Sequence, residues 1–343
     1  MRSMAILLLL FLTFLSQPLS AGLLDKPTEP GPFTVQSLTF PDLIDPSRDD
    51  RRIPVKVHLP KLTGKWPVVV VSHGAGGNWD ANYAQAVHLA SYGYAVFCVE
   101  HVGSNTDQMK KSLRWLKNVK RMTRNANEVL GRPRDISFVL DKAEVWNREH
   151  PLLRDQLDLD HIGMLGHSFG AYTTLAVLGV RPALDWLTPT VAPGAGLGPD
   201  LSDPRVDVGV ALSPQGPGEP FFLESSYQYL KRPVLGITGS RDKQQGAKPE
   251  NRKKFFELIP ANGSMFLWLE NADHIAFSDA SGSGRRSLYS RTRSDVQPIT
   301  RVATLYFFEA RLRKNKEAES RLSDKGLRPF LQGKVTDLAL YRK

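Results

Sequence analysis

The sequence predicts an α/β protein with a mostly parallel central sheet and helices on both faces. Short runs rich in valine, isoleucine and leucine recur along the chain, and such runs are typical of strands buried on both faces. Stretches with helical character lie between them, and alternation of strands with helices indicates a parallel sheet. We expect strands at residues 68–71, 94–99, 162–165, 206–212, 234–237 and 265–269, and helices at residues 81–91, 135–149, 168–180 and 250–259.

An antiparallel edge is expected before the parallel strands. Residues 33–40 and 52–59 alternate between apolar and polar side chains, which is typical of two half-buried strands joined as a hairpin. One further helix is expected at residues 298–314, after the last strand. We therefore expect a linker at residues 22–32, one domain at residues 33–317 and a polar C-terminal tail at residues 318–343.

Two segments interrupt the alternation. Residues 105–133 are polar and basic, with a few apolar side chains at helical spacing, and residues 183–204 are rich in proline and glycine. Insertions of this size near the ends of strands often line or cover a pocket. We expect both segments to lie near the functional site and to influence the choice of substrate.

The N-terminus predicts export. Arg2 precedes an apolar run at residues 5–15, and a short segment containing small residues then leads to Ala21. This arrangement indicates a secretory signal peptide at residues 1–21, because a membrane-spanning helix needs about 20 apolar residues. A periplasmic or secreted location is therefore expected. Cys98 is the single cysteine, so no internal disulfide can form.

The chain is basic, with 45 lysine and arginine residues against 35 aspartate and glutamate residues and a formal net charge of +10. No helix-turn-helix, zinc-finger or aromatic RNA-binding pattern accompanies this charge, which argues against nucleic acid as a partner. A solvated basic surface is the simplest interpretation. For an exported protein, the charge is also compatible with peripheral contact with an anionic envelope surface.

Residues 162–172 contain the motif that is most informative about function. Gly166, Ser168 and Gly170 form a Gly-x-Ser-x-Gly pattern, with an apolar run before it and a helical stretch after it. A serine at a tight turn between a strand and a helix is exposed above the sheet, and small neighbours permit the strained backbone. The helix N-terminus also directs N–H groups towards negative charge that develops there. Ser168 is therefore the predicted nucleophile.

The base and the acid are predicted from chain order. A serine hydroxyl needs a base to take its proton, and a histidine oriented by a carboxylate can serve. In this architecture the order along the chain is serine, acid, histidine. His274 is the only histidine after Ser168, and Asp242 follows the strand expected at residues 234–237. We predict Ser168, Asp242 and His274 as catalytic residues, with Asp273, Glu270 and Asp207 as alternative acids and His167 in a structural role.

The same chemistry needs hydrogen-bond donors for an oxyanion. One donor is the N–H group after the nucleophile, and the other comes from a loop after an early strand. Residues 72–77, Ser-His-Gly-Ala-Gly-Gly, directly follow the four valines at residues 68–71. Glycines in this loop let the backbone approach a substrate closely. We predict that Ala75 and Phe169 supply the two N–H groups of an oxyanion hole.

These motifs together resemble the α/β-hydrolase superfamily. Within it, the chain is most similar to the platelet-activating-factor acetylhydrolase and predicted dienelactone hydrolase group, on the basis of residues 82–101 and 134–141. The resemblance covers residues 33–277 and implies an α/β-hydrolase fold and hydrolysis of short acyl esters. The motifs that carry it are at residues 72–77, 99–101, 166–170, 239–242 and 273–274.

The resemblance implies the roles already predicted for Ser168, Asp242 and His274, with Ala75 and Phe169 at the oxyanion hole. Two related groups differ at these positions. Dienelactone hydrolases have a cysteine nucleophile where this chain has Ser168. Polyester hydrolases usually have an aromatic residue at the position of Ala75 and methionine at that of Phe169.

The sequence therefore predicts an exported serine esterase that cleaves carboxylic esters with a short acyl group. Its expected partner is a small-molecule or lipid ester substrate. A catalytically idle hydrolase fold that binds an envelope lipid or polymer, and a cutinase-like polyester hydrolase, are the alternatives. The eight histidines are scattered and no His-Glu-x-x-His pattern occurs, so no metal or other cofactor is expected.

Overall fold

The computed structural model describes residues 24–111, 114–243, 248–279 and 290–343. The signal peptide expected at residues 1–21 lies outside the described residues. The strands are β1 (Val35–Phe40), β2 (Ile44–Asp45), β3 (Arg51–Arg52), β4 (Val55–Pro60), β5 (Trp66–Ser72), β6 (Ala95–Val99), β7 (Leu157–His167), β8 (Val206–Leu212), β9 (Val234–Arg241), β10 (Met265–Asp273) and β11 (Leu338–Arg342).

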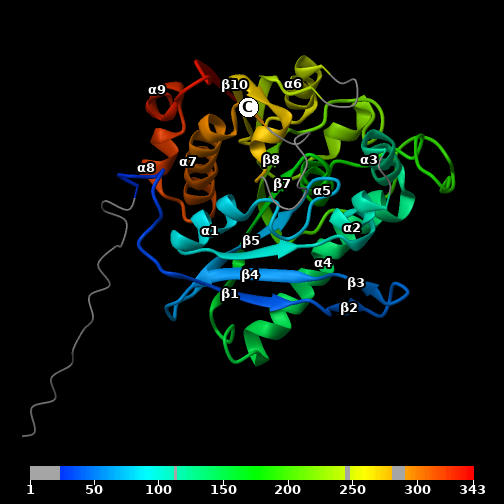
Figure 1. Ribbon diagram of the computed structural model, residues 1–343, viewed down its shortest axis with the longest axis horizontal. Coiled ribbons are helices and arrows are strands. Elements are labelled where there is room, and N and C mark those ends of the chain that lie inside the picture. The colour runs from blue at the N-terminus through cyan, green and yellow to red at the C-terminus, as the bar shows by residue number, and fades with distance from the viewer. Residues whose placement is uncertain (1–23, 112–113, 244–247, 280–289) are drawn as a thin grey trace, which may run out of the picture.

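Helices connect most of these strands (Figure 1). Among the described residues, none of the helices combines the length and the apolar character that crossing a membrane requires. The helices are α1 (Tyr83–Ser91), α2 (Thr106–Lys110), α3 (Trp115–Arg124), α4 (Ala126–Glu149), α5 (Phe169–Val177), α6 (Pro249–Leu258), α7 (Arg293–Leu312), α8 (Lys316–Arg321) and α9 (Asp324–Leu327).

The central sheet is mostly parallel, as the sequence predicts. Within the described residues it has nine strands in the order β1-β4-β6-β5-β7-β8-β9-β10-β11, and β2 and β3 form a separate pair. The strands from β6 to β10 in this order pair in parallel. β4 pairs antiparallel with β6, and β1 pairs antiparallel with β4. The α/β class and the N-terminal antiparallel edge are therefore confirmed.

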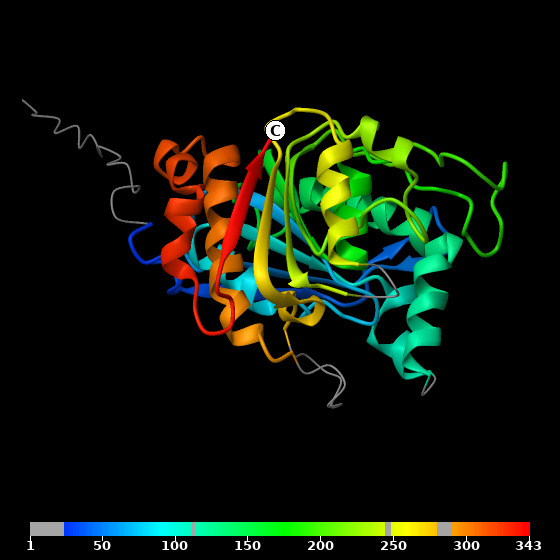
Figure 2. The same cartoon turned by 90° about the horizontal axis from the view of Figure 1, so that it is seen from above.

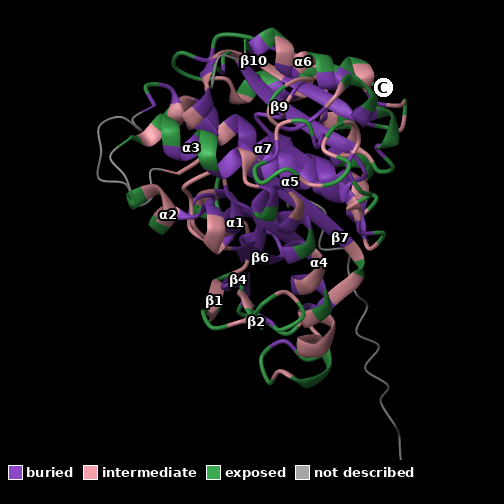
Figure 3. Cartoon of the chain, turned by 90° about the vertical axis from the view of Figure 1, so that its right-hand side faces the viewer, coloured by how far each residue is buried: buried purple, intermediate pink, exposed green. Residues whose placement is uncertain are grey.

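Helices cover both faces of the sheet (Figure 2). The run of valines in β5 explains why both faces are apolar. Val68 and Val70 pack in the core that contains residues of α4, α5 and α6, whereas Val69 and Val71 pack in the core that contains residues of α1 and α7. Successive side chains of a strand point to opposite faces, so an unbroken apolar run buries both. Figure 3 shows the buried centre and the exposed outer loops.

The helix expected at residues 135–149 begins earlier than predicted. α4 starts at Ala126, because the Asn125 side chain accepts a hydrogen bond from the N–H group of Glu128 and caps the helix. The helix continues through Pro133, the residue at which helical structure would ordinarily be interrupted. The described residues of the insertion at 105–133 therefore include α2, α3 and the first turns of α4.

Residues 318–343 belong to the domain, which differs from the tail expected after residue 317. β11 pairs antiparallel with β10 and extends the sheet. Ala318, Leu322 and Leu327 are fully buried in the core that α7 covers. Many charged residues lie among them, so the segment resembles a polar tail in its sequence although these side chains are buried.

The segment at residues 24–32, expected as a linker, packs on the same domain. Leu24 is fully buried, and the Arg321 guanidinium donates a hydrogen bond to its carbonyl oxygen at 2.5 Å. The N–H group of Gly31 donates to the Ser91 hydroxyl at 2.8 Å. Chain segments before and after the predicted domain therefore meet on its surface.

Substitution of Leu338 tests whether β11 stabilises the domain. Leu338 is 4% exposed, and a carboxylate buried there without a partner is unfavourable. We expect Leu338→Asp to lower the free energy of unfolding by about 2–4 kcal/mol in chemical denaturation. The control is Thr336→Asp at an exposed position, for which we expect a change below about 0.5 kcal/mol. Equal effects of the two substitutions would contradict the assignment of β11 to the domain.

Candidate active site

Ser168 lies in the turn between β7 and α5. Its φ of 55° and ψ of −114° are unfavourable for a residue with a side chain. Glycine is required at positions 166 and 170, because neighbouring backbone atoms leave no room for a side chain. A Cβ atom at Gly170 would lie 1.8 Å from the carbonyl oxygen of Ser72, and one at Gly166 would lie 2.1 Å from that of Gly170. Close backbone packing therefore holds the turn that presents Ser168 at the carboxyl edge of the sheet.

The structure brings Ser168, Asp242 and His274 together from three parts of the chain. Asp242 directly follows β9, and His274 begins the short turn η3 (His274–Phe277) after β10. His274 Nε2 lies 3.0 Å from Ser168 Oγ, and His274 Nδ1 lies 2.7 Å from Asp242 Oδ1. Because a carboxylate only accepts hydrogen bonds, Nδ1 carries the proton of the neutral ring. Nε2 then accepts from the Ser168 hydroxyl.

Burial and nearby charge set the protonation of these groups. Burial alone raises the pKa of the Asp242 carboxyl, but the charge of Arg252 and the contacts with His274 outweigh it, and the pKa lies well below its ordinary value. Burial lowers the pKa of His274, and the attraction of Asp242 offsets this only in part. At neutral pH the carboxylate is therefore ionised and the imidazole is neutral, as a general base must be.

The alternative acids have other partners. Asp273 accepts hydrogen bonds from two N–H groups of the η3 turn at 3.1 Å each and caps it. Glu270 accepts from a hydroxyl on β9 at 2.6 Å. Asp207 lies near the start of β8, away from Ser168, and accepts from an N–H group on β7 at 3.0 Å. Asp242 is thus the candidate acid that contacts the imidazole of His274.

His167 contacts the backbone of His274, the predicted base. Its Nε2 atom lies 2.9 Å from the carbonyl oxygen of His274. Burial lowers the pKa of His167 to about 3, so the ring is neutral and Nε2 donates its proton to this carbonyl. His167 therefore positions the backbone of His274, in agreement with the structural role that the sequence predicts.

The loop at residues 72–77 lies beside the nucleophile turn. Ala75 lines the same pocket as Ser168 and Phe169. Within the described residues, the N–H group of Ala75 donates no hydrogen bond. Phe169 is the first residue of α5, and N–H groups in the first turn of a helix have no partner within the helix. Both predicted oxyanion donors are therefore available to a ligand.

A buried polar network lies beneath this loop. His101 Nε2 lies 3.0 Å from the hydroxyl that ends β5, and its Nδ1 lies 2.8 Å from Asp135 Oδ2 on α4. Arg132, also on α4, donates to the carbonyl oxygen of His73, and its guanidinium lies 4.2 Å from the centre of the Phe169 ring. Arg132 thus contacts both segments that carry the predicted oxyanion donors. The sequence offers no signal for it, because helical spacing does not mark which basic residue points inward.

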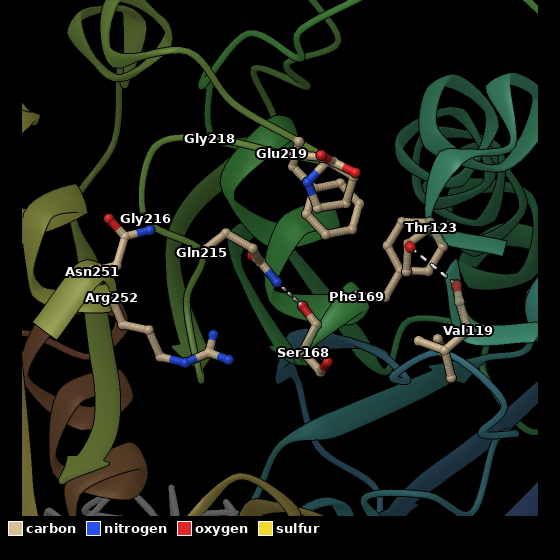
Figure 4. Close-up of a pocket in the computed structure, with 13 residues that line it drawn as sticks. Val119, Thr123, Ser168, Phe169, Gln215, Gly216, Gly218, Glu219, Asn251 and Arg252 are labelled. Carbon is tan, nitrogen blue, oxygen red and sulfur yellow. Dashed lines mark hydrogen bonds between the residues drawn. The ribbon is translucent and has the colours of Figure 1, made fainter. Parts of the chain in front are cut away.

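Ser168 opens into a pocket that is open to solvent at its mouth. Phe169 and Phe221 are stacked, with ring centres 5.2 Å apart. Val119 and Thr123 of α3 lie on the same side as Phe169 (Figure 4). The insertion at residues 105–133 therefore lines the pocket, as expected. The remaining lining residues are Ala75, Gln215, Gly216, Gly218, Glu219, Pro220, Asn251 and Arg252.

The second insertion, at residues 183–204, differs from expectation, because none of its residues is part of the described lining. It supports the junction between α3 and α4. The N–H group of Ala126 donates to the carbonyl oxygen of Thr188 at 3.0 Å, and that of Thr188 donates to the carbonyl oxygen of Arg124 at 2.7 Å. This insertion therefore contacts the end of α3 and the start of α4, outside the pocket.

Comparison with known proteins identifies the family. Residues 67–281, more than half of the chain, match the model of the alpha/beta hydrolase fold. The chain belongs to this family. The α/β-hydrolase is also similar to two platelet-activating factor acetylhydrolases. The one from Bos taurus is 28% identical over 142 residues, 33% of this chain and 32% of the relative. The one from Canis lupus familiaris is 28% identical over 154 residues, 36% of this chain and 35% of the relative.

This chain thus spans about a third of the length of these two curated relatives. The resemblance that the sequence motifs predict, to α/β-hydrolases and to the acetylhydrolase group, is confirmed.

Gln215 is a further residue that holds the nucleophile turn of this α/β-hydrolase. Its Nε2 atom donates to the carbonyl oxygen of Ser168 at 2.6 Å (Figure 4). The Tyr227 hydroxyl donates in turn to the carbonyl oxygen of Gln215 at 2.8 Å. The available signal for Gln215 is its place just after β8, because ligand-binding groups of parallel sheets gather beyond the carboxyl ends of strands.

Two glycine substitutions test the close packing of the nucleophile turn. In Gly170→Ala the new Cβ would lie 1.8 Å from a backbone oxygen, so we expect the free energy of unfolding to fall by at least about 3 kcal/mol. In Gly131→Ala, within α4, the nearest atom is 3.6 Å away, and we expect no change or a gain of up to about 1 kcal/mol. Chemical denaturation measures both, and similar values for the two variants would contradict the packing account.

Proposed function

We propose that this protein is an exported serine esterase that cleaves carboxylic esters with a short acyl group. The observation that carries the proposal is the hydrogen-bonded series Ser168–His274–Asp242, with 3.0 Å and 2.7 Å between the contacting atoms. Similarity to two acetylhydrolases supports the same class of reaction. Export rests on the signal peptide expected at residues 1–21.

In the proposed acylation step, Ser168 Oγ attacks the carbonyl carbon of the ester and its proton passes to His274 Nε2. The former carbonyl oxygen becomes an oxyanion and accepts hydrogen bonds from the N–H groups of Ala75 and Phe169. Asp242 stabilises the imidazolium. His274 then gives its proton to the leaving alcohol oxygen as the C–O bond breaks, which leaves an acyl group on Ser168.

Water completes the cycle. His274 Nε2 takes a proton from a water molecule, whose oxygen attacks the acyl carbon. The second oxyanion is stabilised at the same two N–H groups. When it collapses, the bond to Ser168 Oγ breaks, the proton returns from His274 to this oxygen, and the carboxylic acid departs.

We assign the acyl group to the apolar side of the pocket. Phe169 and Phe221 are 1% and 5% exposed, and Tyr172 stacks on Phe221 with ring centres 4.6 Å apart. Because these rings pack on one another, a longer acyl chain has to displace an aromatic side chain in this direction. Their packing therefore favours a short acyl group.

A fluorophosphonate probe tests the proposed nucleophile. We expect the probe to label the wild-type protein and not Ser168→Ala, and we expect hydrolysis of a short-chain nitrophenyl ester to fall by at least about 1000-fold in the variant. Ser320→Ala, at an exposed position, is the matched control and is expected to be labelled like the wild type. Equal labelling of Ser168→Ala would refute the proposal. Absence of turnover by the wild type, together with binding of Ser168→Ala to anionic vesicles, would favour the idle binding fold.

Substitution of Phe221 tests the assignment of the acyl side. Phe221→Ala removes one ring of the stack, so we expect kcat/KM for an octanoate ester, relative to a butyrate ester, to rise by about tenfold or more. Tyr229→Ala removes a partly exposed aromatic ring in a nearby segment outside the pocket and is expected to leave this ratio unchanged. A nitrophenyl ester series provides the measurement. An unchanged ratio in Phe221→Ala would place the acyl group elsewhere.

A further inference from the structure

Arg252 contacts two of the three residues proposed for catalysis. It lies on α6, is 5% exposed and borders the pocket (Figure 4). Its Nε atom lies 3.0 Å from Asp242 Oδ1 and donates to the carbonyl oxygen of the same residue at 3.1 Å. Its Nη2 atom lies 3.4 Å from His274 Nδ1. No sequence motif marks Arg252, because these contacts depend on how α6 packs against the end of β9.

The approach of Arg252 to His274 brings two hydrogen-bond donors together. Nδ1 of His274 donates to Asp242, and a guanidinium has only donors, so Nη2 gains no hydrogen bond from Nδ1. While the imidazole is neutral, the charge of Arg252 balances that of Asp242. When the imidazole gains a proton, a second positive charge forms beside the guanidinium, and one carboxylate then serves both cations.

We propose that Arg252 is a positioning residue of the esterase, which orients the carboxylate of Asp242 and keeps His274 in its neutral, proton-accepting form into the acid range. The inference rests on the function proposed above. Orientation follows from the hydrogen bonds of Asp242, whose Oδ1 faces Arg252 and His274 while Oδ2 accepts from the Thr238 hydroxyl at 2.6 Å. The effect on His274 follows from the repulsion of like charges in a buried site.

The other end of the guanidinium connects this group to the nucleophile turn. Nη1 of Arg252 donates to the carbonyl oxygens of Ser213 and Pro214 at 3.0 Å each. The next residue, Gln215, donates to the carbonyl oxygen of Ser168. A lysine at position 252 supplies a positive charge but cannot form this planar set of contacts. Comparing Arg252→Lys with Arg252→Met therefore separates the effect of the positive charge from the effect of the hydrogen-bond geometry.

Among the described residues, three other titratable or charged groups near His274 have hydrogen-bond partners of their own. Asp273 directs its carboxylate to the hydroxyls of Ser290 and Thr292. Arg293, on α7, donates to the carbonyl oxygen of Ser278, the residue after the η3 turn, at 2.7 Å. His167, at the end of β7, is neutral. These groups face the turn from β10, α7 and β7, whereas Arg252 approaches the imidazole ring itself.

The pH dependence of kcat/KM tests the effect of the charge. Wild type, Arg252→Met and Arg252→Lys are compared with a short-acyl nitrophenyl ester. Without the positive charge the imidazolium is favoured, so we expect the acid limb of Arg252→Met to move up by about one pH unit or more. We expect the acid limb of Arg252→Lys to lie near that of the wild type, with a lower kcat. For the wild type, we expect the midpoint of the acid limb to lie below 6.5, the ordinary pKa of a histidine side chain.

Titration of the His274 imidazole by NMR measures the same pKa without turnover. It is carried out in the Ser168→Ala background, so its outcome is independent of the proposed function, which the fluorophosphonate probe tests. The inference would be overturned if the His274 titration were the same with and without Arg252→Met. It would also be overturned if the His274 pKa in Ser168→Ala alone were 6.5 or above. A purely structural role changes stability or KM and leaves this pKa in place. If Arg252→Met does not fold, Arg252→Gln, which also removes the charge, replaces it in the same titration.

Discussion

The backbone of Gly170 lies against the carbonyl oxygen of Ser72, so close that no side chain fits between them. This contact joins the first turn of α5 to the end of β5, and therefore joins the nucleophile turn to the loop that carries Ala75. The two segments predicted to carry the oxyanion donors therefore touch through their backbones. The strand order places β5 beside β7, and β8 and β9 bring Gln215 and Asp242 to the same edge of the sheet.

Buried charge is the second feature on which the site depends. On one side of Ser168, Asp242 contacts Arg252. On the other side, Asp135 beneath the 72–77 loop contacts Arg48 and Arg51. Ionised groups removed from water are tolerated only when they are paired and hydrogen-bonded. Each group therefore holds its neighbours in one arrangement, and the loss of a single partner leaves an uncompensated charge next to the site.

The residues proposed for chemistry could be predicted because each has a local signal. Ser168 has glycines two residues away on either side, His274 is the only histidine that follows it, and Asp242 follows an apolar strand. Arg252 and Arg132 have no such signal, because they lie on helices among other basic residues and only the packing of those helices selects them. The sequence prediction misses β11 because its short apolar run, Leu338–Tyr341, lies within a segment rich in charged residues.

The pairing of β11 with β10 has a consequence for biosynthesis. β10 ends at the turn that carries His274, and β11 covers the outer edge of β10. Ser168, Asp242 and His274 all precede β11 in the chain, so a ribosome completes the whole proposed triad before it makes this strand. Until then the edge of β10 is open to pairing with other chains. We therefore expect Ser168, Asp242 and His274 to reach their final arrangement only after β11 has been synthesised and has paired with β10.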